Sequence, residues 1–312
     1  MIAGNKWIYH AVAFVTVAIW GSTFVFTKML LQAGLSPAQI FTLRFVIAYV
    51  LLVACSLFNS QHSLQRHTLE KRTLNSQLFS SSWQDELVML VLGITGGSLY
   101  FLTENAALLY TTATNTSLIV CSCPLFTMFL VALFFRRGEH LGRSQAAGSL
   151  IAFVGMAVVV LNGRFVLHLS PVGDLLAFAA CLCWAVYSLL MKYASMRYSP
   201  LFITRKVFFY GLLTIIPYYI IYPGFPPLSV LLSSRVVWNL LFLGVVASML
   251  CFLVWNWVIR QLGAVVATNW VYLNPVSTIV FAWWLLSEQI TPWFLLGSAL
   301  ILLGMYLCDR RL

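Results

Sequence analysis

Charged residues are scarce in this sequence. Asp, Glu, Lys and Arg make up 8% of the 312 residues, whereas 61% are hydrophobic. An ordinary soluble domain carries about 25% charged residues. A soluble fold of this length could not hide so much apolar surface from water, so the composition excludes an ordinary soluble domain. It predicts a chain whose solvent is mostly lipid.

Acidic residues are the scarcest charged group. There are 8 Asp and Glu against 18 Lys and Arg, which gives a formal net charge of +10. Such a balance could suggest a nucleic-acid partner. The basic residues, however, form no cluster or stripe and lie between long apolar runs. A nucleic-acid site needs a basic patch on one face, so we expect no nucleic-acid partner.

Motifs for catalysis, metal binding and nucleotide binding are also missing. The sequence contains neither H-E-x-x-H nor G-x-x-x-x-G-K-[ST]. The seven cysteines lie in or beside apolar runs, and their odd number and spacing predict free thiols. We therefore expect no cofactor, no metal and no catalytic residue. The five histidines are scattered at His10, His62, His67, His140 and His168.

Long apolar runs dominate what is present. A membrane-spanning helix needs about 20 predominantly apolar residues. The connections between the runs are short, except for a polar and basic loop at 59–85. The fold class that we predict is therefore all-α integral membrane, with ten transmembrane helices. They are expected at 8–31, 37–58, 86–109, 112–135, 144–163, 173–192, 201–222, 236–260, 264–287 and 292–308.

The distribution of Lys and Arg predicts the orientation. Cytoplasmic loops carry an excess of these residues. Most of the 18 fall on one side when the N-terminus is placed in the cytoplasm. An even number of helices returns the C-terminus to that side. We therefore expect a multi-pass protein of the cell (inner) membrane with both termini and loop 59–85 in the cytoplasm.

The sequence also contains an internal repeat. Residues 93–124 align without gaps with residues 244–275, so that Asn105 matches Asn256 and Pro124 matches Pro275. This predicts two five-helix repeats, residues 1–165 and 166–312. Because five is odd, the second repeat must enter the membrane from the opposite side. Inverted repeats are typical of secondary transporters, whose substrate site lies near the midplane between the repeats.

Several motifs follow one another in a recognisable order. With them, the chain resembles the drug/metabolite transporter superfamily, specifically its EamA-type ten-helix permeases. The resemblance covers nearly the whole chain, although Trp184-Ala185 departs from Trp20-Gly21, and Glu104-Asn105 stands where apolar residues are usual. The motifs are Trp20-Gly21-Ser22-Thr23-Phe24 with Lys28, Arg44, Ala107-Leu108-Leu109-Tyr110-Thr111, Pro124, Gly138-Glu139, Gln145, Gly148 and Gly155, then Pro275, Ser287-Glu288, Gly297 and Gly304.

The resemblance implies a secondary transporter, often an exporter, of amino acids or related small amphipathic metabolites. Its substrate would be a small molecule moved by alternating access. A drug or cation exporter is the alternative within the same fold. A membrane-embedded enzyme or a channel would be a different class, but neither the paired catalytic groups of the former nor the repeated selectivity segment of the latter is visible.

Two sets of helix-breaking or helix-packing residues repeat in both halves. The glycines at 148 and 155, and those at 297 and 304, lie seven apart and share a helix face. Small residues allow membrane helices to approach closely, so we expect helices 144–163 and 292–308 to be packing elements, with a homodimer contact as a further use. Pro124 and Pro275 are candidate hinges, with a static kink as the alternative.

Several predicted helices combine aromatic and polar residues on one face. Such faces suit a cavity that binds an amphipathic solute through a few polar groups. Ordinary helix packing explains any single residue better, whereas a cavity explains the set better. The predicted substrate-cavity residues are Trp20, Thr23, Tyr100, Glu104, Asn105, Trp184, Tyr187, Ser188, Trp255, Asn269 and Tyr272.

Glu104 stands out because it lies well inside a predicted membrane helix. A carboxylate at that depth is costly to leave ionised, and ionisable residues within the membrane are functional candidates. Three roles are open. Glu104 could take up and release a proton that couples transport to a proton gradient, it could pair with Arg44 or bond locally as a structural element, or it could recognise a substrate amine.

Overall fold

The computed structural model describes residues 6–64, 79–111, 116, 119–134, 142–161, 170–222, 224–286 and 292–309. Among these residues every regular element is helical. The first half contains α1 (Lys6–Gln32), α2 (Pro37–Leu64), α4 (Trp83–Gly93), η1 (Ile94–Ser98), α5 (Leu99–Tyr110), α7 (Cys123–Phe134) and α8 (Arg143–Leu161). The second contains α9 (Pro171–Ser195), α10 (Pro200–Thr214), α11 (Ile216–Ile221), α12 (Leu228–Leu231), α13 (Ser234–Leu241), η2 (Phe242–Leu250), α14 (Cys251–Leu262), α15 (Ala264–Asn269), η3 (Trp270–Leu273), α16 (Asn274–Leu286) and α17 (Pro292–Asp309).

Long apolar helices confirm the all-α integral membrane fold. Within the described residues, seven helices are long and apolar enough to cross a bilayer, and Cys123–Phe134 and Pro292–Cys308 are shorter apolar helices. The count of ten membrane crossings remains a prediction, as does a homodimer.

The loop predicted at 59–85 is shorter than expected at both ends. Helix α2 continues to Leu64 and α4 already begins at Trp83, while residues 65–78 lie outside the described part. The early start of α4 has a local cause. The side chain of Ser82 accepts a hydrogen bond from the backbone N–H of Asp85, and Asp85 and Glu86 are acidic residues in the first turn. A serine cap and acidic first-turn residues both stabilise a helix start.

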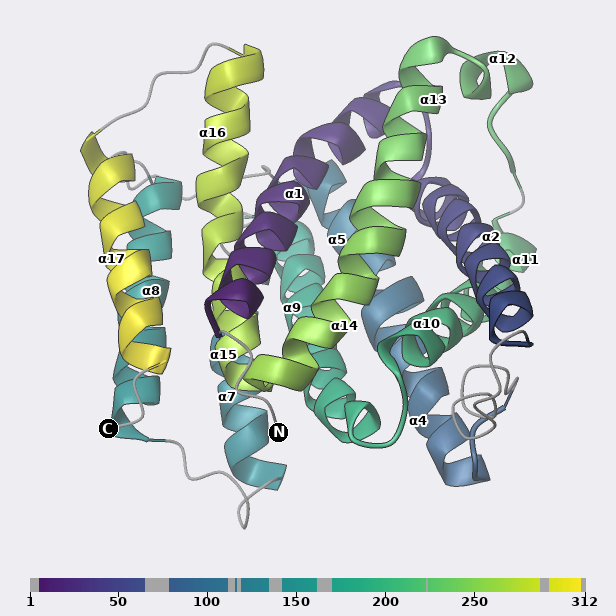
Figure 1. Cartoon of the computed structure of the whole chain (residues 1–312). Helices are drawn as coiled ribbons and strands as arrows, with labels where there is room; N and C mark the ends of the chain where they lie inside the picture. Colours follow the sequence, from purple (N-terminus) through teal and green to yellow (C-terminus); the bar gives the residue numbers. More distant parts are fainter. Residues whose placement is uncertain are drawn as a thin grey trace.

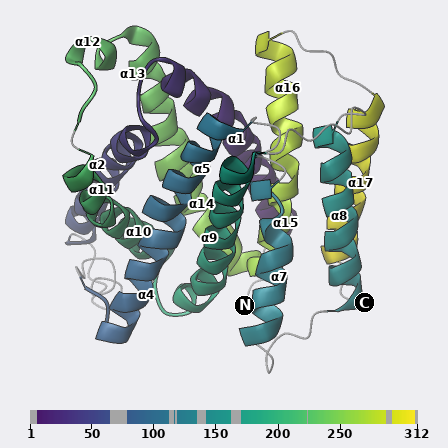
Figure 2. The same cartoon turned by 180° about the vertical axis from the view of Figure 1, so that it is seen from behind.

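The two halves run through the molecule in opposite directions (Figure 1). α1 begins at the end where the chain termini lie and rises away from it, whereas α9, its counterpart, descends toward that end. α8 likewise rises, whereas α17 descends. Figure 2 shows the same opposition from behind. We call the end that holds the start of α1 and the finish of α17 the termini end, and the other the opposite end.

Equivalent close contacts relate the two halves. Gly93 of α4 packs so closely on α10 that an added Cβ would collide with the side chain of Tyr210. Its counterpart Gly244 packs on α2, where a Cβ would lie 2.8 Å from the Cβ of Ile47. Ile47 and Tyr210 are themselves counterparts when Ser36-Pro37 and Ser199-Pro200 are aligned. The repeat found in the sequence is therefore also a repeat of helix packing.

α8 and α17 pack along each other more extensively than any other pair of elements, and they stand at one side of the molecule (Figure 1). The predicted glycines make this approach possible. A Cβ at Gly148 would lie 2.5 Å from the carbonyl oxygen of Gly304, and one at Gly155 would lie 2.7 Å from that of Gly297. These four glycines are therefore packing positions within the chain, as predicted from their spacing.

Both halves contain a π-helical segment that sequence reasoning missed. η1 joins α4 to α5, and η2 joins α13 to α14 at the equivalent place. In η1 the backbone of Gly97 leaves helical geometry, at φ −129° and ψ −107°, and Gly96 leaves no room for a side chain against the ring of Tyr187. π-helical bulges are frequent at functional sites.

The two candidate hinge prolines occupy helix starts, where the sequence predicted the interior of continuous helices. Pro124 is the second residue of α7 and follows a turn at 121–122. Pro275 is the second residue of α16 and follows the 3-10 segment η3. Proline suits the first turn of a helix because no partner is lost there. The prolines thus mark breaks in the chain path, and their role as hinges remains a prediction.

Candidate functional site

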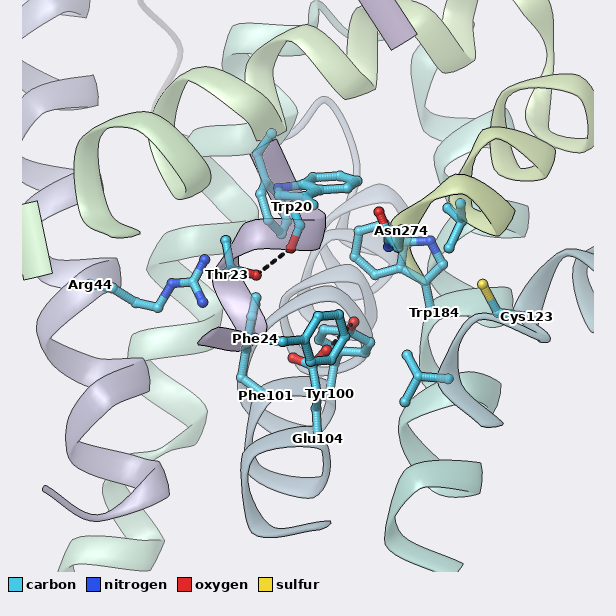
Figure 3. A pocket seen from close by; sticks show the side chains of 13 residues that line it. Trp20, Thr23, Phe24, Arg44, Tyr100, Phe101, Glu104, Cys123, Trp184 and Asn274 are labelled. Carbon is cyan, nitrogen blue, oxygen red and sulfur yellow. Dashed lines mark hydrogen bonds between the residues drawn. The ribbon is translucent and has the colours of Figure 1, made fainter. Parts of the chain in front are cut away.

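A small cavity lies between the two halves (Figure 3). Its volume is about 30 Å³, and a single water needs roughly 10–15 Å³ of such space. In this conformation the cavity therefore has room for a few waters and must widen to admit a larger solute. It is lined by Trp20, Thr23, Phe24, Arg44, Tyr100, Phe101, Glu104, Val120, Cys123, Trp184, Phe252, Val271 and Asn274.

Much of the lining consists of counterparts from the two repeats. Four pairs line the cavity together, and they are Trp20 with Trp184, Phe101 with Phe252, Val120 with Val271, and Cys123 with Asn274. The last two pairs lie at or just before the starts of α7 and α16, where the chain path breaks. The cavity therefore lies where the two repeats meet, which is the place expected for a substrate site in an inverted-repeat protein.

Aromatic rings form most of the wall. The ring centroids of Trp20 and Trp184 are 5.3 Å apart, and those of Tyr100 and Trp184 are 5.1 Å apart. Phe252 lies 5.7 Å from Trp20. These separations are typical of stabilising aromatic pairs. The wall is consequently rigid and apolar, with few polar groups set into it.

The two counterpart tryptophans differ in their hydrogen bonding. The indole N–H of Trp20 donates to the backbone carbonyl of Ala247, 2.9 Å away in η2. This bond joins α1 of the first repeat to the π-helical segment of the second. The indole N–H of Trp184 is buried without a hydrogen-bond partner among the described residues. A buried donor without a partner is uncommon in folded proteins and calls for an explanation.

Arg44 is the basic group of the cavity. It reaches from α2 and is only 2% exposed. Its Nε donates to the Ser248 hydroxyl, 2.8 Å away in η2, and its guanidinium carbon lies 4.5 Å from the centre of the Phe101 ring. A hydrogen bond and an aromatic face both suit a guanidinium group. The side chain is thus held in one direction, toward the cavity centre (Figure 3).

Glu104 is the acidic group. It is 9% exposed, and its Oε1 accepts a hydrogen bond from the Tyr100 hydroxyl at 2.9 Å. Among the described residues the salt bridges do not include one between Glu104 and Arg44. The local hydrogen bond considered from sequence is therefore present, whereas the direct pair with Arg44 is not formed. Both charged groups face the same cavity.

The structure brings together five of the predicted cavity residues at the lining, namely Trp20, Thr23, Tyr100, Glu104 and Trp184. The other six do not line it. Two of them pack against the lining tryptophans. The ring centroid of Trp255 is 5.0 Å from that of Trp20, and the ring centroid of Tyr187 is 5.1 Å from that of Trp184. Tyr272 and Ser188 are buried, and their hydroxyls have no hydrogen-bond partner among the described residues.

The two asparagines predicted for the cavity hold helices together instead. The amide of Asn105 donates to the backbone carbonyl of Pro37 at 3.3 Å, and so connects α5 to the start of α2. Asn269 accepts from the Ser149 hydroxyl at 3.2 Å and donates to the Cys308 sulfur, which connects α15 to both α8 and α17. Helix spacing alone could not separate these positions from the lining.

The repeat alone could not reveal the residues that sequence reasoning missed. Phe252 and Val271 are counterparts of Phe101 and Val120, but neither member of either pair was predicted. The same holds for Asn274 and its counterpart Cys123. The missed lining residues are Phe24, Arg44, Phe101, Val120, Cys123, Phe252, Val271 and Asn274, of which Arg44 had been considered only as a partner of Glu104.

Away from the cavity, a charged network ties helices together at the termini end. Asp85 of α4 is buried and accepts hydrogen bonds from Arg197 and Tyr198, both at 2.9 Å. Its neighbour Glu86 accepts hydrogen bonds from Lys206 and Tyr210 of α10. The network therefore joins α4 of the first repeat to α10 of the second and to the turn that precedes α10.

The opposite end lacks this network at the equivalent positions. The counterparts of Asp85 and Glu86 are Val236 and Val237, and the counterpart of Lys206 is Leu43. Ala33 and Ile47 stand where Arg197 and Tyr210 stand at the termini end. At these equivalent positions, the termini end carries charged and polar side chains and the opposite end carries apolar ones.

The fold and the site together define a polytopic membrane protein of two inverted repeats with a cavity between them. A comparison with known families identifies it further. The model of the EamA-like transporter family matches twice, at residues 7–161 and 171–308. The chain belongs to the EamA-like transporter family, as its motifs suggested. The repeated match agrees with the repeated architecture.

Individual relatives are similar over most of their length. An uncharacterized transporter of Archaeoglobus fulgidus is 28% identical over 305 residues, which are 97% of each chain. A probable terminal-alkyne amino-acid exporter of Streptantibioticus cattleyicolor is 29% identical over 228 residues, covering 72% of this chain and 74% of the relative. One solved crystal structure has the same fold, with a TM-score of 0.73, 19% identity and 97% of each chain covered.

Proposed function

We propose that this transporter exports amino acids or related small amphipathic metabolites across the cell membrane by alternating access. The observation that carries the proposal is the cavity between the repeats, which combines aromatic walls with one buried acid and one buried base. Few and precisely directed polar groups in an apolar site are typical of small-molecule recognition. The relative named as an amino-acid exporter supports the same substrate class.

The mechanism follows from the inverted repeats. Rocking one repeat against the other would open the cavity first to one end and then to the other. The breaks before α7 and α16 and the π-helical segments η1 and η2 border the cavity region, and they are the places where the helices can bend. We place both termini in the cytoplasm, because the basic residues gather at their end of the molecule.

Counterflow in proteoliposomes tests the function directly. Vesicles containing the purified protein are loaded with unlabelled phenylalanine or leucine and diluted into labelled amino acid. We expect protein-dependent accumulation of label that collapses when the internal amino acid is omitted. Vesicles with the double variant Trp20→Ala and Trp184→Ala, which removes the central aromatic pair, should accumulate far less. No counterflow with any amino acid in a broad panel would overturn the proposal.

A drug or cation exporter is the second candidate. It is favoured by the aromatic wall beside the Glu104 carboxylate, since aromatic rings and carboxylates both attract organic cations. The buried Arg44 argues against it because a like charge in the same cavity repels a cation. Counterflow of a quaternary ammonium compound, in the absence of amino-acid counterflow, would select this candidate instead.

A further inference from the structure

We propose that the cavity binds its substrate as a zwitterion, with the carboxylate at Arg44 and the ammonium group at Glu104. The inference rests on the proposed function and deepens it, since it names the charge pattern of the substrate and the residues that bind each charged group. It requires a substrate with both charges a short distance apart and an apolar or aromatic side chain.

The first observation is that a buried acidic side chain and a buried basic side chain share a cavity without pairing. A buried ion is costly unless a partner compensates it. Arg44 and Glu104 are 2% and 9% exposed, and both line the cavity, yet Arg44 bonds to Ser248 and Glu104 to Tyr100. A ligand that carries both charges would compensate each group. The two charges also cancel, so the site as a whole favours neither a net cation nor a net anion.

The second observation is that each group keeps bonding capacity for a ligand. The hydrogen bond recorded for Arg44 within the described residues uses Nε, so the two terminal amino groups remain for a carboxylate, which guanidinium binds with two parallel bonds. The bond recorded for Glu104 in the same part of the chain uses Oε1, which leaves Oε2 for a donor. Figure 3 shows both side chains directed at the space between them.

A third observation comes from Asn274. Its side chain lines the cavity and is 7% exposed, and its amide oxygen has no hydrogen-bond partner among the described residues. It lies across the cavity from Arg44 (Figure 3). An acceptor at this position can take a second hydrogen bond from an ammonium group bound at Glu104. The buried acceptor then has the partner that it otherwise lacks.

The charged groups break the symmetry of an otherwise symmetric wall. The counterpart of Arg44 is Val207, and the counterpart of Glu104 is Trp255. Both charges therefore come from the first repeat, while the aromatic rings come from both. A substrate is consequently held in one orientation, and its side chain lies among rings contributed by the two repeats.

A charge-analogue series tests the inference. Phenylalanine, phenylalanine amide and N-acetylphenylalanine share one side chain but are zwitterion, cation and anion at neutral pH. Binding to the purified protein is followed by the fluorescence of the cavity tryptophans or by calorimetry. Loss of one charge-assisted contact corresponds to about a 10- to 100-fold change in affinity. We expect phenylalanine to bind at least about 10-fold more tightly than either analogue.

Two variants show which residue binds which charged group of the ligand. Glu104→Gln should lose affinity for phenylalanine and keep its affinity for N-acetylphenylalanine. Arg44→Gln should lose affinity for phenylalanine and keep its affinity for phenylalanine amide. Arg235→Gln, which removes an exposed basic residue outside the cavity, is the matched control and should leave the wild-type order unchanged. Monodisperse elution in size-exclusion chromatography shows that a variant is folded.

The outcomes separate the inference from the proposed function. Amino-acid counterflow without a preference for the zwitterion would overturn the inference and leave the exporter proposal standing. Equal or tighter binding of the amide would also overturn it, in favour of a cation site. Should both variants fail to fold, the order of the three ligands on the wild-type protein still decides, and binding of none of them overturns the inference.

Discussion

Breaking the charged network at the termini end should shift the transporter between its conformations. Lys206 is 4% exposed and is held by Glu86. Glu86→Gln keeps the shape of the side chain but leaves a buried ammonium group without its counter-ion. Removal of one partner from a fully buried pair costs about 3–5 kcal/mol. The Glu86 side chain is 20% exposed, so solvent lowers this cost, and we expect about 2 kcal/mol.

This free energy is lost only in conformations in which the network is formed, as it is here. Under the proposed alternating access, we expect opening of the termini end to separate the partners. A difference of about 2 kcal/mol changes a two-state ratio by roughly 30-fold. The conformation open at the termini end should therefore become much more populated in Glu86→Gln. Cys123 reports the change because it lines the cavity and is 1% exposed in this conformation.

The assay is the rate at which a membrane-impermeant thiol reagent modifies Cys123. The assay uses a parent variant in which the other six cysteines are replaced by serine, and the reagent is applied to vesicles from the side of the termini. Labelling should be much faster in Glu86→Gln than in the parent. The double variant Glu86→Gln with Lys206→Met is the control, because it leaves no unpaired charge and should label less rapidly than the single variant. Unchanged labelling in Glu86→Gln would refute the reasoning.

Three further predictions concern packing, coupling and topology. Gly148→Ala places a Cβ 2.5 Å from the Gly304 carbonyl oxygen. The overpacking should destabilise the protein by about 1–3 kcal/mol and lower its Tm in detergent. Gly224 has open space around it, so Gly224→Ala is the control and should leave the Tm unchanged. If Glu104 couples transport to protons, Glu104→Gln should still exchange substrate but lose accumulation driven by a pH gradient, and unchanged pH-driven accumulation excludes that role. A cysteine at Ser81 should resist impermeant reagents in intact cells, and strong labelling from outside would contradict cytoplasmic termini.

The sequence predicted the helices and their repeat because these depend on patterns along the chain. Apolar runs mark spans in lipid wherever they occur, and counterparts such as Trp20 and Trp184 keep their places in both halves. The start of α4 was misplaced because polar Asp85 was assigned to a loop. Hydrogen bonds from Arg197 and Tyr198, in the turn between α9 and α10, compensate its charge, and these partners are distant in sequence.

The candidate site was predicted only in part for a related reason. Spacing along a helix shows which residues share a face, but it does not show which face lines a cavity. Trp255 shares the aromatic character of Trp20 yet packs behind it, and Asn105 bonds to a neighbouring helix. The π-helical segments depend on how helices pack around them, since η1 contains a Gly-Gly pair but η2 does not.

The difference between the two ends of the molecule has a consequence for its working cycle. Under the proposed alternating access, two identical repeats would exchange conformations when the protein rocks, so the two open states would be related by a two-fold rotation and would have equal free energy. Divergence of the repeats removes that degeneracy, because equivalent positions hold ion pairs at the termini end and apolar side chains at the opposite end. The two open states should then differ in free energy, so we expect the empty protein to populate one of them more than the other.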